Sequence, residues 1–154
     1  DYFRTASGAL YFPDRPWSNA SPYGYTGNVL SVVRNTDSMP DSELKELFLT
    51  ELYNLSGYKF RLPDGRYTLK IMMRAGFESG RKPGVFVVNV FINGKPVKKN
   101  LDIFKEENPK DGICTLVFQG VMPVGGILSV ELEPSGKNGP TVCLFNAIEV
   151  TREK

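Results

Sequence analysis

Residues 66–73 read Arg-Tyr-Thr-Leu-Lys-Ile-Met-Met, a stretch in which apolar side chains recur at every second position. A period of two is typical of a strand with one buried face, and that face here consists of Tyr67, Leu69, Ile71 and Met73. The strand follows Pro63-Asp64-Gly65, in which proline presets φ and glycine accepts a positive φ. We therefore expect a half-buried strand that is entered through a tight turn.

Four later segments have the same character. Residues 85–92 are rich in β-branched and aromatic side chains and end at Asn93-Gly94, which is the strongest short signal for a β-hairpin. Strands are also expected at 112–118, at 127–133 and, as one long closing strand, at 141–150. The second half of the chain thus reads as strands separated by turns.

The first third of the chain carries weaker signals. Residues 1–40 are rich in Gly, Pro, Ser and Asn and contain two short apolar runs, 9–12 and 29–33, which suggest short strands and long loops. One or two helical turns are expected near 41–46, because a capping residue there is followed by apolar residues at helical spacing. The fold class that follows is all-β, a β-sandwich with one short helix.

Composition excludes several function classes. The chain has 154 residues, no histidine and a net charge of +2. Without histidine it cannot build Ser-His-Asp or Cys-His nucleophilic machinery, and a charge so near balance does not suggest a nucleic-acid partner. No targeting segment or membrane span is visible. We expect one domain over residues 1–154, excised from a larger protein, because the chain opens at Asp1 without an initiator methionine.

The two cysteines lie inside expected strands. Cys114 and Cys143 are surrounded by Leu, Val and Phe. They could form a disulfide between the closing strands, but a buried free cysteine behaves as a small apolar residue. Two unpaired thiols are the preferred reading.

Acidic residues offer two alternatives to a purely structural reading. Glycosidases use a pair of carboxylates, and residues 102–111 could also supply oxygen ligands to calcium. Each of these polar residues also suits a solvated turn or the outer face of a strand. The spacing of the possible calcium ligands lacks the regularity of an EF-hand loop. The residues are Asp102, Glu106, Glu107, Asn108, Asp111, Glu131 and Glu133. We therefore expect no catalytic residue and no cofactor, with a structural calcium ion as the weaker alternative.

Aromatic residues near loops and strand ends carry the main functional signal. A rigid ring with a polar tip can stack on the C–H face of a sugar and pair with its hydroxyl groups. The same rings could instead plug the ends of a sandwich core. The set consists of Tyr11, Phe12, Trp17, Tyr23, Tyr25, Tyr53, Tyr58 and Phe77.

Several strings, taken in order, resemble the malectin and malectin-like domain family. Residues 50–53 (Thr-Glu-Leu-Tyr) resemble its Thr-Glu-Arg-Tyr stretch, and residues 58–67 resemble its Tyr-X-Phe-X-Leu-Pro-X-Gly-X-Tyr run. Residues 90–104 resemble its hairpin and the Asp-Ile segment that follows, and residues 139–145 resemble its closing strand. Asp14-Arg-Pro-Trp17 and Tyr23-Gly-Tyr-Thr-Gly27 are similar to the malectin-like domains of bacterial β-galactosidases and related glycoside hydrolases.

The resemblance implies a fold and a set of ligand-binding residues. The fold would be a jelly-roll β-sandwich of the galactose-binding type, non-catalytic, that binds glycans through loop aromatics. The family's binding positions fall at Tyr23 with its neighbour Tyr25, at Tyr53 and at Phe77. The family's aspartate is replaced by Asn138, and one aromatic of its Tyr-Phe pair is missing before Phe77.

The function that follows is a carbohydrate-binding module. It would hold a secreted, periplasmic or cell-surface bacterial glycoside hydrolase on its polysaccharide or oligosaccharide substrate. Its partners would be a glycan and the neighbouring catalytic domain of the same polypeptide, with no nucleic acid and no membrane insertion. The alternative is a structural module that packs against that domain without sugar affinity. Independent glycosidase activity is the least favoured reading.

Overall fold

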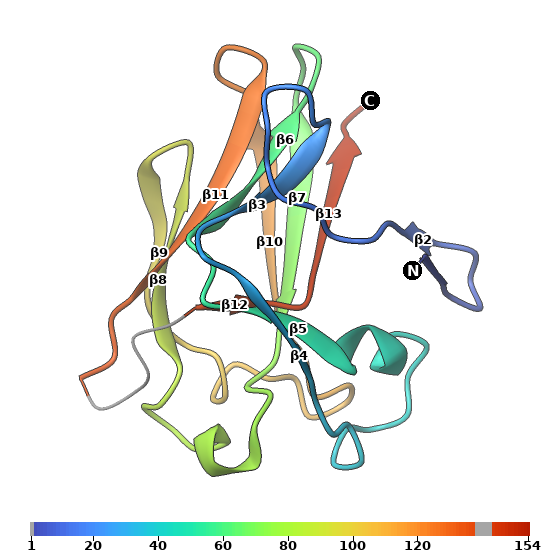
Figure 1. Ribbon diagram of the computed structural model, residues 1–154, viewed down its shortest axis with the longest axis vertical. Coiled ribbons are helices and arrows are strands. Elements are labelled where there is room, and N and C mark those ends of the chain that lie inside the picture. The colour runs from blue at the N-terminus through green and yellow to red at the C-terminus, as the bar shows by residue number, and fades with distance from the viewer. Residues whose placement is uncertain (1, 138–142) are drawn as a thin grey trace.

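The computed structural model describes residues 2–137 and 143–154 as two facing layers of strands (Figure 1). One layer is a five-stranded sheet in the order β3-β6-β11-β8-β9. Its strands are antiparallel neighbours, so their inward side chains build one wall of the core. The bounds are β3 Tyr23–Thr26, β6 Gly57–Arg61, β8 Val87–Ile92, β9 Lys95–Asp102 and β11 Ile127–Pro134.

The second layer consists of two three-stranded sheets in the orders β10-β7-β13 and β12-β5-β4. A separate two-stranded hairpin, β1-β2, lies beside β13 on the right of Figure 1. The bounds are β1 Phe3–Arg4, β2 Leu10–Tyr11, β4 Leu30–Val33, β5 Thr50–Tyr53, β7 Tyr67–Met73, β10 Cys114–Val121, β12 Leu144–Phe145 and β13 Ala147–Arg152. The expected all-β sandwich is confirmed.

The strand β7 confirms the alternation of apolar side chains expected at residues 66–73. Tyr67, Leu69, Ile71 and Met73 are all buried in the main core. Met72, on the opposite face, is also fully buried, because it packs into a second small cluster with Phe48 and Ile113. The Asn93-Gly94 turn between β8 and β9 has φ values of 50° and 75°, the positive values that this pair tolerates.

The closing strand differs from the sequence prediction. Of the expected strand 141–150, the first two residues lie outside the described part of the chain, and the rest is two strands. β12 pairs with β5 and β13 pairs with β7, so the chain changes sheets at Asn146. The Asn146 side chain accepts a hydrogen bond from the Arg74 N–H (2.9 Å) and donates one to the Thr50 carbonyl (3.3 Å). These contacts fix the place where the chain passes from one sheet to the other, which the hydrophobic periodicity of the sequence does not reveal.

The helical content also differs in detail. The helical turns expected near 41–46 are a 3₁₀ helix, η1, over Lys45–Phe48, and the chain is extended from Thr50 in β5. A second 3₁₀ helix, η2, covers Glu78–Gly80 and was not expected. Within the described residues, no helix has the length and apolar content needed to cross a membrane.

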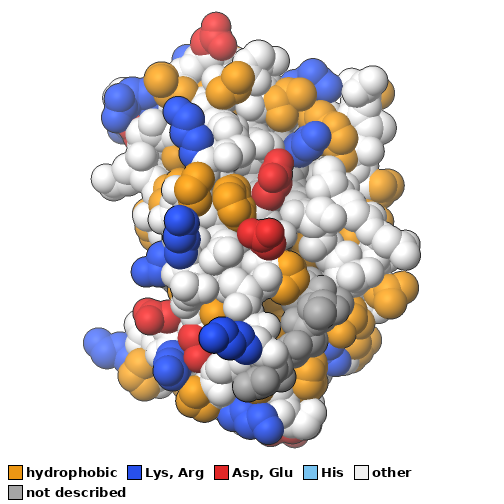
Figure 2. Space-filling view, turned by 90° about the vertical axis from the view of Figure 1, so that its left-hand side faces the viewer, with side chains coloured by type: hydrophobic (Ala, Val, Ile, Leu, Met, Phe, Trp, Pro, Cys, Tyr) orange, Lys and Arg blue, Asp and Glu red, His pale blue; other side chains and the backbone are white. Residues whose placement is uncertain are grey.

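Charges are mixed on the face formed by the left-hand side of the molecule. Figure 2 shows Lys and Arg side chains interspersed there with acidic ones. Exposed residues of the five-stranded sheet likewise have both signs, with Lys95, Lys98 and Lys99 on β9 and Glu131 and Glu133 on β11. This view shows no continuous basic surface of the kind that binds nucleic acid.

Both cysteines are free and buried, as the preferred reading expects. Burial raises the pKa of each thiol to about 12. We therefore expect neither thiol of the native protein to react with Ellman's reagent at about pH 8, because the thiolate is the reactive form. Unfolding should expose both. Rapid modification of the native protein would contradict this burial.

The same shift predicts the direction of an alkaline effect on stability. Thiols of the unfolded chain ionise near their ordinary pKa, whereas the folded thiols stay protonated to about 12. The unfolded state therefore binds fewer protons in this interval, and the free energy of unfolding should fall as the pH rises toward 12.

Candidate functional site

An ion pair links β5 to the residue that follows β4. The Arg34 Nε donates to Glu51 Oε1 at 2.7 Å, and the Nη2 donates to the same oxygen. The Glu51 side chain is fully buried, and its Oε2 has no hydrogen-bond partner among the described residues. Burial therefore raises the pKa of Glu51, although the Arg34 guanidinium offsets part of this increase. A buried, half-satisfied carboxylate depends on its single cationic partner.

Two of the expected binding residues lie beside this pair. Tyr53 is two positions from Glu51 on β5, so both side chains project from the same face of the strand. The Arg34 guanidinium lies over the Phe77 ring, 5.5 Å from its centroid. We call Arg34, Glu51, Tyr53 and Phe77 the Arg34 corner.

The segment that carries Phe77 is held close to Glu51. A Cβ atom at Gly76 would overlap the Glu51 carboxylate, so only glycine permits this approach. The Phe77 ring packs edge-on against the buried Phe86, with centroids 5.0 Å apart. A Cβ at Gly80 would lie 2.6 Å from the Phe77 ring. Phe77 is thus confined on two sides.

Glu107 also holds the segment that carries Phe77, residues 75–81. Its carboxylate accepts hydrogen bonds from the Ala75 N–H (3.0 Å) and from Arg81 Nη2 (2.8 Å), and it pairs with Arg74 at 3.4 Å. Arg81 also donates to the Ala75 carbonyl (2.8 Å), which closes the loop 75–81 on itself. Burial and the nearby Arg81 lower the pKa of Arg74, and Glu107 opposes that effect. One carboxylate therefore pairs with two guanidinium groups and fixes the loop.

Tyr23 occupies a different place. Its side chain lines a cleft of about 890 Å³ that is also lined by Leu52 of β5 and Phe145 of β12. Neighbouring residues of a strand project to opposite faces, so Tyr53 points away from the cleft that Leu52 faces. The structure therefore brings Tyr53 and Phe77 to one corner and places Tyr23 at another.

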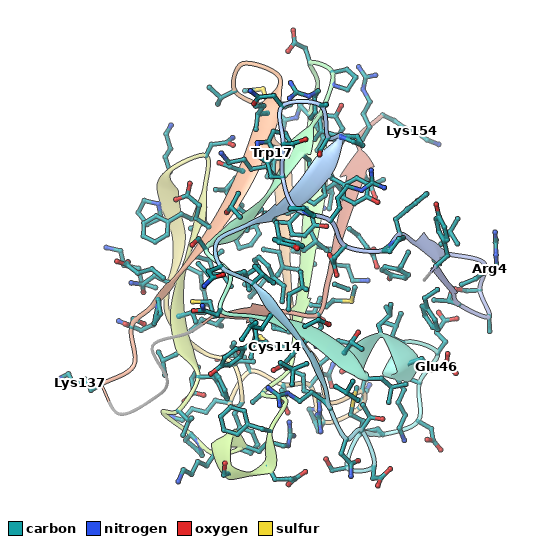
Figure 3. All side chains as sticks on the ribbon, viewed as in Figure 1. Arg4, Trp17, Glu46, Cys114, Lys137 and Lys154 are labelled. Carbon is teal, nitrogen blue, oxygen red and sulfur yellow. The ribbon has the colours of Figure 1, made fainter. Side chains whose placement is uncertain are left out.

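Tyr25 and Asn138 complete the expected set. Tyr25 is partly buried against the main core, and its backbone bonds to Arg15 and Trp17 (both 2.9 Å) cover the outer edge of β3. Figure 3 shows Trp17 at that end of the molecule. Asn138 lies outside the described residues.

Polar side chains of segment 102–111 already accept hydrogen bonds from backbone N–H groups. Asp102 accepts from the Gly84 N–H (2.7 Å), Asn108 from the Lys110 N–H (2.9 Å) and Asp111 from the Ile113 N–H (2.9 Å). With Glu107 bound to arginines, these oxygens shape the loop. Among residues 2–137 and 143–154, no group of three or more acidic or cysteine side chains could hold a metal ion.

Sequence reasoning did not identify Arg34 or Glu51 as functional residues, and it considered Glu107 only as a solvated acidic residue for a catalytic pair or a calcium site, whereas the structure buries Glu107 between Arg74 and Arg81. Glu51 carried a usable signal, because it occupies the same strand face as Tyr53 at a spacing of two. Arg34 and Glu107 carried none, since each acts on a residue at least 17 positions away.

Comparison with known proteins decides the family. The family profile described as "Malectin domain" matches residues 1–147. The chain belongs to the malectin domain family. Sequence comparison with curated proteins finds no match.

Solved structures place this malectin domain among parts of larger proteins. It is similar to a domain of Bacteroides uniformis β-glucuronidase, with 19% identity and a TM-score of 0.81, over 99% of this chain and 17% of that one. It is also similar to the ANX1 ectodomain from Arabidopsis thaliana, with 15% identity and a TM-score of 0.75, over 99% of this chain and 39% of that one. The domain thus spans less than half of either protein, and at these identities the likeness concerns the fold.

Proposed function

We propose that this malectin domain is a non-catalytic carbohydrate-binding module that holds a glycoside hydrolase on its polysaccharide or oligosaccharide substrate. Family membership and the similarity to part of a β-glucuronidase support the proposal. The observation that carries it is the Arg34 corner, where the Arg34 guanidinium lies over the Phe77 ring and Tyr53 projects from the same face of β5 as Glu51. A secreted, periplasmic or cell-surface location in a bacterium belongs to the same proposal.

The corner offers two kinds of contact to a sugar. The Tyr53 ring, and the part of the Phe77 ring that Arg34 and Phe86 leave accessible, supply apolar surface for C–H groups, and the Tyr53 hydroxyl can pair with a sugar hydroxyl. The Arg34 side chain is 16% exposed and is held in place by Glu51, so its remaining N–H groups are preorganised donors. Such a site should bind with a Kd on the order of micromolar to millimolar. Attachment to an enzyme then raises the effective substrate concentration.

The test is retention on glycans after truncation of the two rings. Tyr53→Ala and Phe77→Ala should each weaken binding of a glycan-array hit by about tenfold or more, while the fold is kept. Met122→Ala is the matched control, because Met122 is 60% exposed and is not a member of the corner. Unchanged binding by both ring variants would refute the site, and an array without hits would refute the function.

A structural module is the second candidate, and one observation favours it. The edge strand β4 exposes Leu30 and Val33, which are 59% and 78% accessible. Exposed apolar side chains on a strand edge can pack against a neighbouring domain of the same polypeptide. A stable complex with that domain, lost in Val33→Lys and without any glycan affinity, would favour this function over sugar binding.

A further inference from the structure

The cleft that contains Tyr23 is separate from the Arg34 corner. It lies at the open side of the sandwich, between the inner side of β3 and β6 and the edge strand β13. Residues 146–151 at and within β13 all line the cleft. Because neighbouring side chains on a strand project to opposite faces, a cleft over one face would touch only every second residue. The cleft therefore runs along the edge of β13. We call this space the N-terminal cleft, because β1, β2 and residues 12–14 form its outer wall.

Aromatic rings form one wall of the N-terminal cleft. Phe12 is 58% exposed and Tyr2 is 65% exposed, and their rings meet edge-on at 5.4 Å. Behind Phe12 lies Tyr23 (6.5 Å), which is stacked on Tyr58 (6.4 Å, 8° between the planes). The Tyr23 hydroxyl donates a hydrogen bond to the Pro13 carbonyl at 3.2 Å, which connects the stacked pair of tyrosines to residues 12–14 of the cleft wall. The exposed rings are therefore supported and available for stacking.

Three carboxylates are among the polar groups that line the cleft. Asp14 accepts a hydrogen bond from the Tyr58 hydroxyl through Oδ1 (2.9 Å), which leaves Oδ2 without a donor among the described residues. Glu149 accepts from the Tyr11 hydroxyl and from Lys70 Nζ (3.2 Å), so its charge is largely balanced. Glu46 of η1 lies on the same side of the molecule as the β1-β2 hairpin, which carries Arg4 (Figure 3).

The negative charge of the cleft lining favours neutral sugars over negatively charged ones. The described lining contains three carboxylates and no Lys or Arg. Two cations lie nearby, because Lys70 pairs with Glu149 at 3.2 Å and the Arg15 guanidinium lies 4.8 Å from the centroid of the Tyr23 ring. These two positive charges do not offset three carboxylates, so a uronate would still meet an excess of like charge, whereas neutral hydroxyl groups can donate to carboxylate oxygens. Aromatic faces combined with a few fixed polar groups are typical of small-ligand sites.

From these observations we propose that the N-terminal cleft is a second carbohydrate site, selective for neutral oligosaccharides over uronate-bearing ones. Phe12 is the stacking platform, and Asp14 is the hydroxyl acceptor. The inference rests on the proposed glycan-binding function but uses a different surface, so the domain would hold glycans at two separate places.

Chemical-shift mapping tests this inference directly. The ¹⁵N-labelled domain is titrated with cellotetraose, maltotetraose, β-1,4-galactotetraose and tetragalacturonate. We expect at least one neutral tetrasaccharide to shift the amides of residues 147–151, and tetragalacturonate to leave them unmoved. These shifts should persist in Tyr53→Ala, weaken about tenfold in affinity in Phe12→Ala and weaken clearly in Asp14→Asn. Val124→Ala, 69% exposed and outside the lining, is the matched control.

The outcomes separate the two proposals. Shifts confined to the Arg34 corner, or cleft shifts equal for neutral and uronate sugars, would overturn the second site and leave the proposed function intact. No shift anywhere with any of the four sugars would overturn the second site, and an empty glycan array would overturn the function itself. Phe12 is largely exposed, so Phe12→Ala should melt like wild type, and circular dichroism checks that its loss of binding is local.

Discussion

Replacing Glu107 by alanine is expected to lower the free energy of unfolding by about 3–5 kcal/mol. The Glu107 carboxylate is 7% exposed and faces two guanidinium groups, of which Arg74 is 4% exposed. Its removal takes away the ion-pair partner of the buried Arg74, and the Ala75 N–H loses its acceptor. The penalty is large because both charged partners have already lost their water.

Chemical denaturation of Glu107→Ala measures this loss. Glu106→Ala is the control, because the neighbouring Glu106 is exposed and forms no ion pair within the described chain. Glu107→Gln should recover only part of the loss, since an amide keeps an acceptor oxygen but not the charge. Equal stability of Glu107→Ala and Glu106→Ala would show that the arginines find other partners.

Phe86→Ala is expected to cost about 3–5 kcal/mol of folding free energy and also to weaken glycan binding. Phe86 is 2% exposed, and its ring supports Phe77 edge-on at 5.0 Å. The cavity left behind would let the Phe77 ring turn away from Arg34, so the Arg34 corner would lose its fixed geometry. Stability and affinity should therefore fall together.

Denaturation and glycan titration of the same sample test this coupling. Val117→Ala is the control, because Val117 is 56% exposed on β10 and belongs to neither candidate site. A destabilised Phe86→Ala variant that binds glycans as tightly as wild type would show that Phe77 holds its position without this support.

The strands were predictable where a local pattern decides them. The alternation of β7 and the Asn93-Gly94 turn are set by residues within a few positions of one another, and both are found as expected. The sheet change at Asn146 was not predictable, because residues 143–150 are apolar apart from Asn146 and Glu149 and their two partners, β5 and β7, are distant in sequence. A mostly apolar run indicates burial but not which strand is the neighbour.

The candidate sites show the same division. Tyr53 and Phe77 could be selected by residue type and family resemblance, and the structure places Phe77 under the Arg34 guanidinium and Tyr53 on the strand face of Glu51. The separation of Tyr23 from them could not be foreseen, because it depends on which face of β5 turns toward β3 and β6. Charge pairing at Arg34 and Glu107 is likewise a consequence of the tertiary fold.

Asn146 has a consequence for how the molecule melts. A single residue separates β12, which belongs to one sheet, from β13, which belongs to another, and its side chain is tied to both neighbourhoods. Neither sheet can fray far without pulling its neighbour out of register, which favours one sharp, all-or-none transition. A flexible glycine insertion at this point should uncouple the halves and broaden the melting curve into two steps.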